Sequence, residues 1–424
     1  MSDVSNTRAM ELVRAAELAT QAGRADEAAQ IWARLLESSP EHPRALFALS
    51  ERALRSGDFD RSRDLLQRAA IAAPNEPGIL LNLAIVERSR GDFGAELAAL
   101  DKAIVLNESL LPALLMKGAV LERLGHPRRA AKVYRTALAV APEQGLTSDT
   151  TQALAHAREV VESQTREMES YLAQRLEPLR TRRADCRLQR FDEALGIATG
   201  TKKAFIPRPA DFLFPQLPAI GYHDADNFPW LVDLEARADI LRGELQNLIT
   251  TEAEEFAPYV QRPASVPVQQ WGELNNSTRW SAYFLWKDGK RNDAHCTRCP
   301  LTTSILESMP MADMPDFAPT AFFSSLDPGA HIPPHTGSTN VRLIVHMPLI
   351  VPPDCSFRVG NETRLWQYAK PWVFDDTIEH EAVNGSNRQR VVLIFDIWNP
   401  ALSDAERELV CELQRGLYDY FAAD

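Results

Sequence analysis

The stretch HIPPHTGSTNVRLIVHMPLIVP, residues 331–352, places two histidines four residues apart and then enters a long apolar run. Residues 340–350 (NVRLIVHMPLI) are rich in branched side chains, which are favoured in β-strands. The histidines precede this run in a polar segment that contains two prolines. The stretch therefore predicts a buried strand that adjoins a polar segment with candidate functional groups.

Short apolar or alternating runs surround this stretch throughout the chain after residue 200. They cover residues 280–287, 320–326, 356–360, 363–367, 371–376 and 390–398, and Pro, Gly or Asn separates them. Many short strands without strand–helix alternation predict a sandwich or barrel, a class that includes the double-stranded jelly roll. Residues 231–256 have helical periodicity instead and are expected to pack outside the sheet.

The first half of the chain differs in composition and has an internal repeat. Seven of the eight Trp lie after residue 200, whereas the first half is rich in Ala, Leu, Glu and Arg, which are strong helix formers. Glycines recur every 34 residues, at Gly23, Gly57, Gly91 and Gly125. Such a period is typical of stacked helical pairs.

Each repeat predicts a helix, a glycine-containing turn, a second helix and a stop. Small residues seven positions before each glycine let the two helices approach closely, and proline cannot continue the second helix. The four units, residues 8–143, resemble the tetratricopeptide repeat, with Ser62 and Glu96 standing where that family prefers Ala. The repeats predict a solenoid whose concave face binds a peptide or helix. The alternative is that they only dimerise the chain or support its second half.

Residues 144–204 are predicted to connect the repeats to a second domain that spans residues 205–424. The connection begins with a long polar helix over about 146–181 that can cap the solenoid. The predicted fold is thus an all-α solenoid followed by a double-stranded β-helix (jelly-roll) domain with flanking helices.

Composition excludes several classes of function. The chain has 424 residues and a formal net charge of −12, which argues against a nucleic-acid groove because phosphate binding needs concentrated Lys and Arg. No apolar run approaches the roughly 20 residues of a membrane helix, and the N-terminus lacks the apolar region of a signal peptide. Five cysteines imply no disulfide framework. We therefore expect a cytoplasmic protein.

The histidines of the second half are the candidate metal ligands. His335 lies in DPGAHIPPHTGSTN and His380 in FDDTIEHEAVNGS, both polar settings within strand-rich sequence. Imidazoles that converge from distant strands suit Fe(II) or a similar metal. The alternative is that each histidine only satisfies a local hydrogen bond.

The ordered series HIPPHTGSTNVRLIVHMPLIVP, RVGNETRLW and VFDDTIEHEAVNGSNRQRVVLIFDIWNP resembles the aspartyl/asparaginyl β-hydroxylase family. That resemblance covers roughly residues 205–405 and is strongest over 271–400. It implies an iron(II)- and 2-oxoglutarate-dependent oxygenase with a jelly-roll core, using O2 as cosubstrate. It also implies that His335 and His380 bind the iron. Gly337 stands where most related oxygenases have a third, carboxylate ligand, and this family shares that gap.

The same resemblance assigns the cosubstrate and substrate contacts. Arg390 matches the family's cation for the distal carboxylate of 2-oxoglutarate, a role for which the Arg fork is suited. Ser324 matches the hydroxyl that assists it, and His346 matches a histidine near the other carboxylate. Arg342 matches an arginine near the substrate's acidic group. Ile344 replaces a further arginine of the better-known members, which bears on cosubstrate orientation and substrate charge.

The leading hypothesis is hydroxylation of a carbon, namely the β-carbon of an Asp/Asn-type residue in a protein or peptide that the repeats recruit. One alternative is a hydroxylase of the same family that acts on a small molecule or natural product. Another is a tetratricopeptide scaffold whose jelly roll no longer catalyses.

Overall fold

The computed structural model describes residues 2–186, 188–263 and 265–422, and the chain divides into two compact units, Met1–Leu188 and Gln189–Asp424. The division falls inside the connecting segment predicted at 144–204. Each unit is described by itself.

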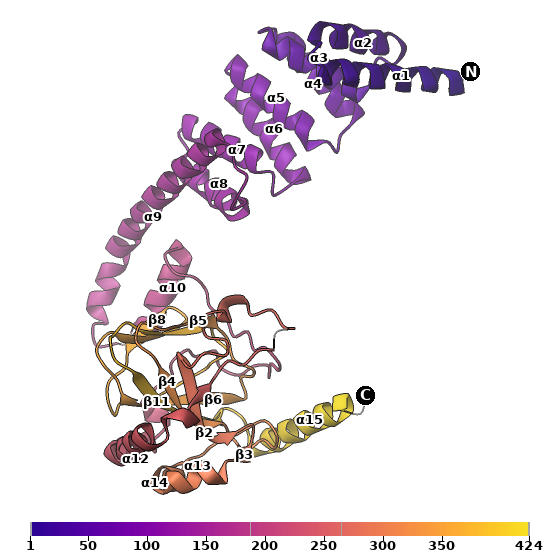
Figure 1. Cartoon of the computed structure of the whole chain (residues 1–424). Helices are drawn as coiled ribbons and strands as arrows, with labels where there is room; N and C mark the ends of the chain where they lie inside the picture. The colour runs from indigo at the N-terminus through magenta and orange to yellow at the C-terminus, as the bar shows by residue number, and fades with distance from the viewer. Residues whose placement is uncertain (1, 187, 264, 423–424) are drawn as a thin grey trace. The chain divides into compact units, whose positions relative to one another are not determined.

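The first unit is built of α-helices that pack as consecutive antiparallel pairs (Figure 1). The helices are α1 (Ser2–Gln21), α2 (Ala25–Ser38), α3 (Pro43–Arg55), α4 (Phe59–Ala72), α5 (Pro77–Arg90), α6 (Phe93–Leu106), α7 (Leu111–Arg123), α8 (Pro127–Val140) and α9 (Ser148–Arg182). The four periodic glycines lie in the turns between paired helices, with φ values of 72°, 79°, 77° and 75°. This left-handed backbone favours glycine, so the 34-residue period is explained by the turn that closes each pair.

One large residue in the second helix of each repeat fills the interior of the solenoid. Trp32, Leu66, Leu100 and Tyr134 are all buried. Ser62 and Glu96, which depart from the repeat pattern as Glu108 does in place of Pro, are buried polar groups with partners. The Ser62 hydroxyl donates to the Ser50 carbonyl oxygen at 2.9 Å, and Arg123 donates to both carboxylate oxygens of Glu96 at 2.9 Å. Helix α9 packs on α8, as expected of a cap.

The second unit combines two antiparallel sheets with flanking helices. Its strands are β1 (Ala257–Pro258), β2 (Trp280–Lys287), β3 (Lys290–Arg291), β4 (Ala321–Leu326), β5 (His331–His335), β6 (Arg342–Ile350), β7 (Cys355–Val359), β8 (Glu362–Leu365), β9 (Trp372–Phe374), β10 (His380–Asn384) and β11 (Arg390–Trp398). Its α-helices are α10 (Gln189–Thr199), α11 (Leu231–Ala236), α12 (Ala238–Thr251), α13 (Asp293–Arg298), α14 (Pro300–Glu307) and α15 (Asp404–Ala422).

The larger sheet has the order β1-β2-β4-β11-β6-β9 with β3 beside β2, and the smaller sheet has the order β5-β10-β7-β8. From β4 to β11 the chain passes between the two sheets repeatedly, which is the path expected of a jelly roll. The prediction of a helical repeat region followed by an antiparallel β-domain is confirmed. The sequence did not predict β5 and β10, the strands that carry His335 and His380.

The larger sheet is buried on both faces. Phe323, Val345 and Phe395 point outward into a core shared with Leu241 and Leu245 of α12, so the helix predicted over 231–256 does pack outside the sheet. The opposite side chains of the same strands point between the sheets, because side chains alternate along a strand. This inner face carries the candidate site.

Candidate active site

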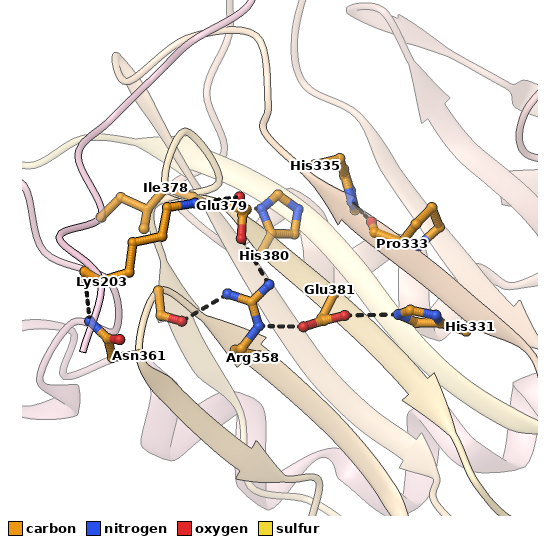
Figure 2. Close-up of polar contacts among 11 residues, drawn as sticks. Lys203, His331, Pro333, His335, Arg358, Asn361, Ile378, Glu379, His380 and Glu381 are labelled. Carbon is orange, nitrogen blue, oxygen red and sulfur yellow. Dashed lines mark hydrogen bonds and ion pairs between the residues drawn. The ribbon is translucent and has the colours of Figure 1, made fainter. Parts of the chain in front are cut away.

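His335 and His380 lie side by side at the facing ends of two neighbouring strands. His335 ends β5, His380 begins β10, and the two residues are directly paired across the antiparallel strands. Their ring centroids are 4.1 Å apart. Each Nδ1 is hydrogen-bonded to a backbone carbonyl oxygen two residues earlier, at 2.7 Å to Pro333 and 3.0 Å to Ile378 (Figure 2). With Nδ1 donating in this way, each Nε2 keeps a lone pair that can bind a metal.

Burial keeps both imidazoles in the neutral form. Desolvation lowers the pKa of His335 to about 3, with the neighbouring His380 adding to the effect. Desolvation likewise lowers the pKa of His380 to about 4. Neutral imidazole is the form that coordinates metals, so this donor pair fits Fe(II).

In the part of the chain that the structure describes, no third protein ligand accompanies the histidines. Across residues 2–186, 188–263 and 265–422, no group of three or more His, Cys, Asp or Glu side chains is placed to hold a metal ion. A Cβ atom at Gly337 would overlap the carboxylate of Asp376, so the glycine leaves room for that side chain. Asp375, the residue before Asp376, accepts hydrogen bonds from the backbone N–H and hydroxyl of Thr377, at 2.9 and 2.6 Å.

Arg390 is a buried cation with no counter-ion among the described side chains. Its side chain is 1% exposed, and no carboxylate of the described residues forms an ion pair with it. Its Nη1 donates to the Ser324 carbonyl oxygen at 3.4 Å, its guanidinium lies 4.7 Å from the Trp366 ring centroid, and its Nε has no partner. Burial lowers its pKa to about 10, so it stays charged at neutral pH. Such a group favours an anionic ligand.

Ser324 and His346 lie beside this cation. The Ser324 oxygen accepts a hydrogen bond from Trp280 Nε1 at 3.1 Å, which leaves its O–H free to donate. His346 is buried, its Nδ1 has no partner, and burial together with the Arg390 charge lowers its pKa well below the usual value. Both residues line one cavity of about 520 Å³ together with His335, His380 and Arg390.

Arg342 also lines this cavity, but two carboxylates already lie beside its charge. Its guanidinium donates to Asp396 at 2.7 Å and lies 3.8 Å from an oxygen of Asp376. Burial raises the pKa of Asp396 to about 6, and Arg342 opposes this shift. Ile344 lies between Arg342 and His346 on the same strand face and adds no charge. All six predicted site residues thus line one cavity, and Arg342 lies two residues before Ile344 on β6.

Asp396 and Tyr259 also line the cavity, and neither was predicted from the sequence. Asp396 is the one charged residue inside the apolar run VVLIFDIW, and that interruption was a usable signal. The Tyr259 ring stacks on Trp280 with centroids 4.1 Å apart and on Phe322 at 5.3 Å, forming one wall of the cavity. Nothing in the local sequence of Tyr259 indicated this contact.

Family models match both units of the chain. Residues 235–400 match the model described as Aspartyl/Asparaginyl beta-hydroxylase, and residues 13–77 and 47–109 match the Tetratricopeptide repeat model. The second unit thus matches the aspartyl/asparaginyl β-hydroxylase family model. The family match begins within α11 and extends beyond the end of β11, so it includes all six predicted site residues.

Two known hydroxylases each match only part of the chain. The human aspartyl/asparaginyl beta-hydroxylase is 36% identical over 135 residues, which are 32% of this chain and 18% of that protein. The ornithine lipid ester-linked acyl 2-hydroxylase of Rhizobium tropici is 33% identical over 186 residues, 43% of this chain and 62% of that protein. The chain therefore spans from about a fifth to about three fifths of these relatives.

Among solved structures, the MamA protein is similar at 19% identity with a TM-score of 0.32, covering 43% of this chain and 96% of that one. Within the described ranges, every helix is too short or too polar to cross a membrane.

Proposed function

We propose that the second unit is an Fe(II)- and 2-oxoglutarate-dependent dioxygenase that hydroxylates the β-carbon of an Asp/Asn-type residue in a protein or peptide. One observation carries this proposal: two neutral imidazoles with free Nε2 atoms share a cavity with an uncompensated buried guanidinium. The first fits a metal with open coordination positions, and the second fits a carboxylate cosubstrate. The family match supports hydroxylation.

In this proposal each residue has a defined task. His335 and His380 hold Fe(II), which with bound 2-oxoglutarate and O2 supplies oxidation of a C–H bond to C–OH while 2-oxoglutarate becomes succinate and CO2. Arg390 and the Ser324 hydroxyl bind the distal carboxylate, and His346 lies near the other carboxylate. Arg342 faces the substrate. The aromatic wall around Tyr259 keeps water from the reacting carbon.

The test is succinate release by the purified chain with Fe(II) and 2-oxoglutarate. We expect slow turnover without substrate, and we expect His335→Ala and His380→Ala each to abolish it. His156→Ala is the matched control, because His156 is exposed in the repeat unit and bonds only to Glu122 at 2.9 Å. Undiminished turnover in either site variant would remove the ligand assignment.

The charge near Arg342 bears on the substrate. Asp376 and Asp396 flank one guanidinium, so a further carboxylate would meet net negative charge, whereas an amide would not. We therefore expect Asn to be preferred over Asp at the reacting position. Paired peptides that differ only in that residue check this through kcat/KM, and a preference for Asp would contradict it.

Two further parts of the proposal concern the whole chain. The repeats recruit the protein or peptide substrate, as the concave face of a solenoid allows. All five cysteines are free, which supports a reducing, cytoplasmic location.

A calorimetric titration with Mn(II) present that detects no 2-oxoglutarate binding would favour the non-catalytic scaffold instead.

A further inference from the structure

Strand β5 carries His335, and few backbone N–H groups near this histidine can donate to β10. Pro333 and Pro334 precede the histidine, and neither has an N–H to donate to β10. The pairing of β5 with β10 is irregular at this point, since His380 opposes His335 but Ala382 opposes Ile332. Strand β5 is also at the edge of its sheet, so no strand holds it from the other side. The backbone alone therefore fixes His335 weakly relative to His380.

Side chains on the outer face of the sheet replace these missing links. Glu381 points away from the cavity, because neighbouring side chains alternate and His380 points inward. One Glu381 oxygen accepts from Arg358 Nε on β7, and the other is 2.8 Å from His331 Nε2 on β5 (Figure 2). A single carboxylate thus ties together the three strands β5, β10 and β7.

Arg358 extends this arrangement to the other side of His380. Its Nη2 donates to Glu379 at 3.0 Å, and its Nη1 donates to the Gly360 carbonyl oxygen at 2.9 Å. Glu379 and Glu381 are the residues immediately before and after His380, and both therefore pair with the same guanidinium. We call His331, Arg358, Glu379 and Glu381 the outer-face network.

The outer-face network also holds the segment that follows α10. Lys203 Nζ lies 3.7 Å from Glu379, and the Phe205 ring centroid lies 5.4 Å from the Arg358 guanidinium. Asn361 donates to the Lys203 carbonyl oxygen at 2.7 Å. The chain that enters this unit from the connecting segment is thereby fixed to the strands that carry both histidines.

We propose that the outer-face network positions His335 and His380 for the metal, with Glu381 as its central positioning residue. None of its side chains lines the cavity, so its effect is transmitted through β5 and β10. The proposal rests on the function proposed above, since it assumes that these histidines bind Fe(II). Removal of a supporting partner of a metal ligand typically weakens metal binding about 10- to 100-fold.

The experiment is metal binding by the full chain, with Co(II) and Mn(II) each added alone. We expect Glu381→Ala to weaken Mn(II) binding by about tenfold and to change the visible absorption of the Co(II) complex, because the ligand geometry changes. His331→Gln cuts only the link to β5, so it should shift both measurements in the same direction by a smaller amount. This second variant keeps the test decisive if Glu381→Ala fails to fold.

Glu362→Ala is the matched control. Glu362 pairs with Arg364 at 2.6 Å within β8 of the same sheet, away from β5 and β10. Its loss should leave the Co(II) spectrum and Mn(II) affinity unchanged. Wild-type binding with unchanged affinity and spectrum in both network variants would overturn the positioning role while leaving the proposed function intact. Failure of the wild-type chain to bind either metal would overturn the proposed function itself.

Discussion

At the scale of single residues, the buried charge of Arg390 should lower the stability of the folded chain, although it serves to bind 2-oxoglutarate. No counter-ion in the described residues compensates this guanidinium. An uncharged side chain of similar length at this buried position should therefore make the metal-free chain more stable. We expect Arg390→Met to raise the free energy of unfolding of the metal-free chain by about 1–4 kcal/mol. The same variant should lose 2-oxoglutarate binding. Urea unfolding followed by Trp fluorescence and a calorimetric titration measure the two effects.

Arg388→Met is the control for this prediction, because Arg388 is exposed two residues before Arg390. It should change neither stability nor 2-oxoglutarate binding. If Arg390→Met lowered stability instead, the cation would be compensated within the protein, and its assignment to a carboxylate ligand would lose its physical basis.

The two neutral histidines should make the metal-free protein sensitive to acid. Their folded-state pKa values, about 3 and 4, lie below the ordinary 6.5, so only the unfolded chain takes up protons as pH falls below 6.5. Their contribution to stability is thus complete above pH 6.5 and is lost as pH falls towards their folded pKa values. For His380 the loss between pH 7 and pH 5 is about 2 kcal/mol.

To isolate the contribution of His380, we compare the wild-type chain with His380→Gln, each unfolded in urea at pH 7 and pH 5. The wild-type chain should lose about 2 kcal/mol more than the variant over this interval. Carboxylates such as Asp396 titrate in both proteins and cancel in the difference. Equal losses would mean that His380 is accessible to protons in the folded chain.

Which residues line the cavity was predictable from sequence only where ordered motifs marked them. His335, His380 and Arg390 occur in ordered motifs, and the structure brings them to one cavity. Asp396 and Tyr259 reach the cavity through contacts between segments far apart in the chain, with Asp396 pairing to Arg342 across neighbouring strands. Such partners depend on strand register, which a single sequence does not specify for strands buried on both faces.

At the scale of elements, the close approach of α7 and α8 depends on Gly118. A Cβ atom at this position would overlap the ring of Tyr134, which fills the interior of the repeat. We expect Gly118→Ala to destabilise the repeat unit by about 1–3 kcal/mol despite the better helix propensity of Ala. Thermal unfolding followed by far-UV circular dichroism measures this change.

Gly78→Ala in α5 is the matched substitution, because nothing lies within 4 Å of a Cβ atom there. It should be neutral or stabilise by up to about 1 kcal/mol. Opposite effects of the two Gly→Ala substitutions on stability would separate the effect of side-chain packing from that of helix propensity. Two equal effects would show that the interior at Gly118 can adjust.

Elements were predicted best where one physical rule dominated their sequence. The glycine period marked every repeat turn, and apolar runs marked β2, β4, β6 and β11. Strands β5 and β10 escaped prediction because β5 contains Pro333 and Pro334 and because β10 is short and places the charged Glu381 on its outer face. The two strands that carry the histidines therefore resemble strands poorly in sequence.

At the scale of the whole molecule, the overall composition conceals two units of different chemistry. All six predicted site residues lie between Ser324 and Arg390, inside the second unit, and the repeats lie in the first. The uneven distribution of Trp predicted this division. The partner of the repeats was not predictable, because a solenoid surface presents exposed side chains whose identity packing does not constrain.

Deletion of residues 1–143 should separate recruitment from catalysis. Succinate release without substrate should persist, because every proposed iron, cosubstrate and substrate contact remains. Turnover of a protein substrate, identified by the mass gain of one oxygen atom, should fall about 100-fold or more at low substrate concentration, since binding by the repeats raises the effective concentration at the cavity. A short peptide that contains only the hydroxylated residue should react equally with both chains, because it does not engage the repeats. Unchanged turnover of the intact substrate after the deletion would instead favour a small molecule or natural product, and the solenoid would then serve other contacts.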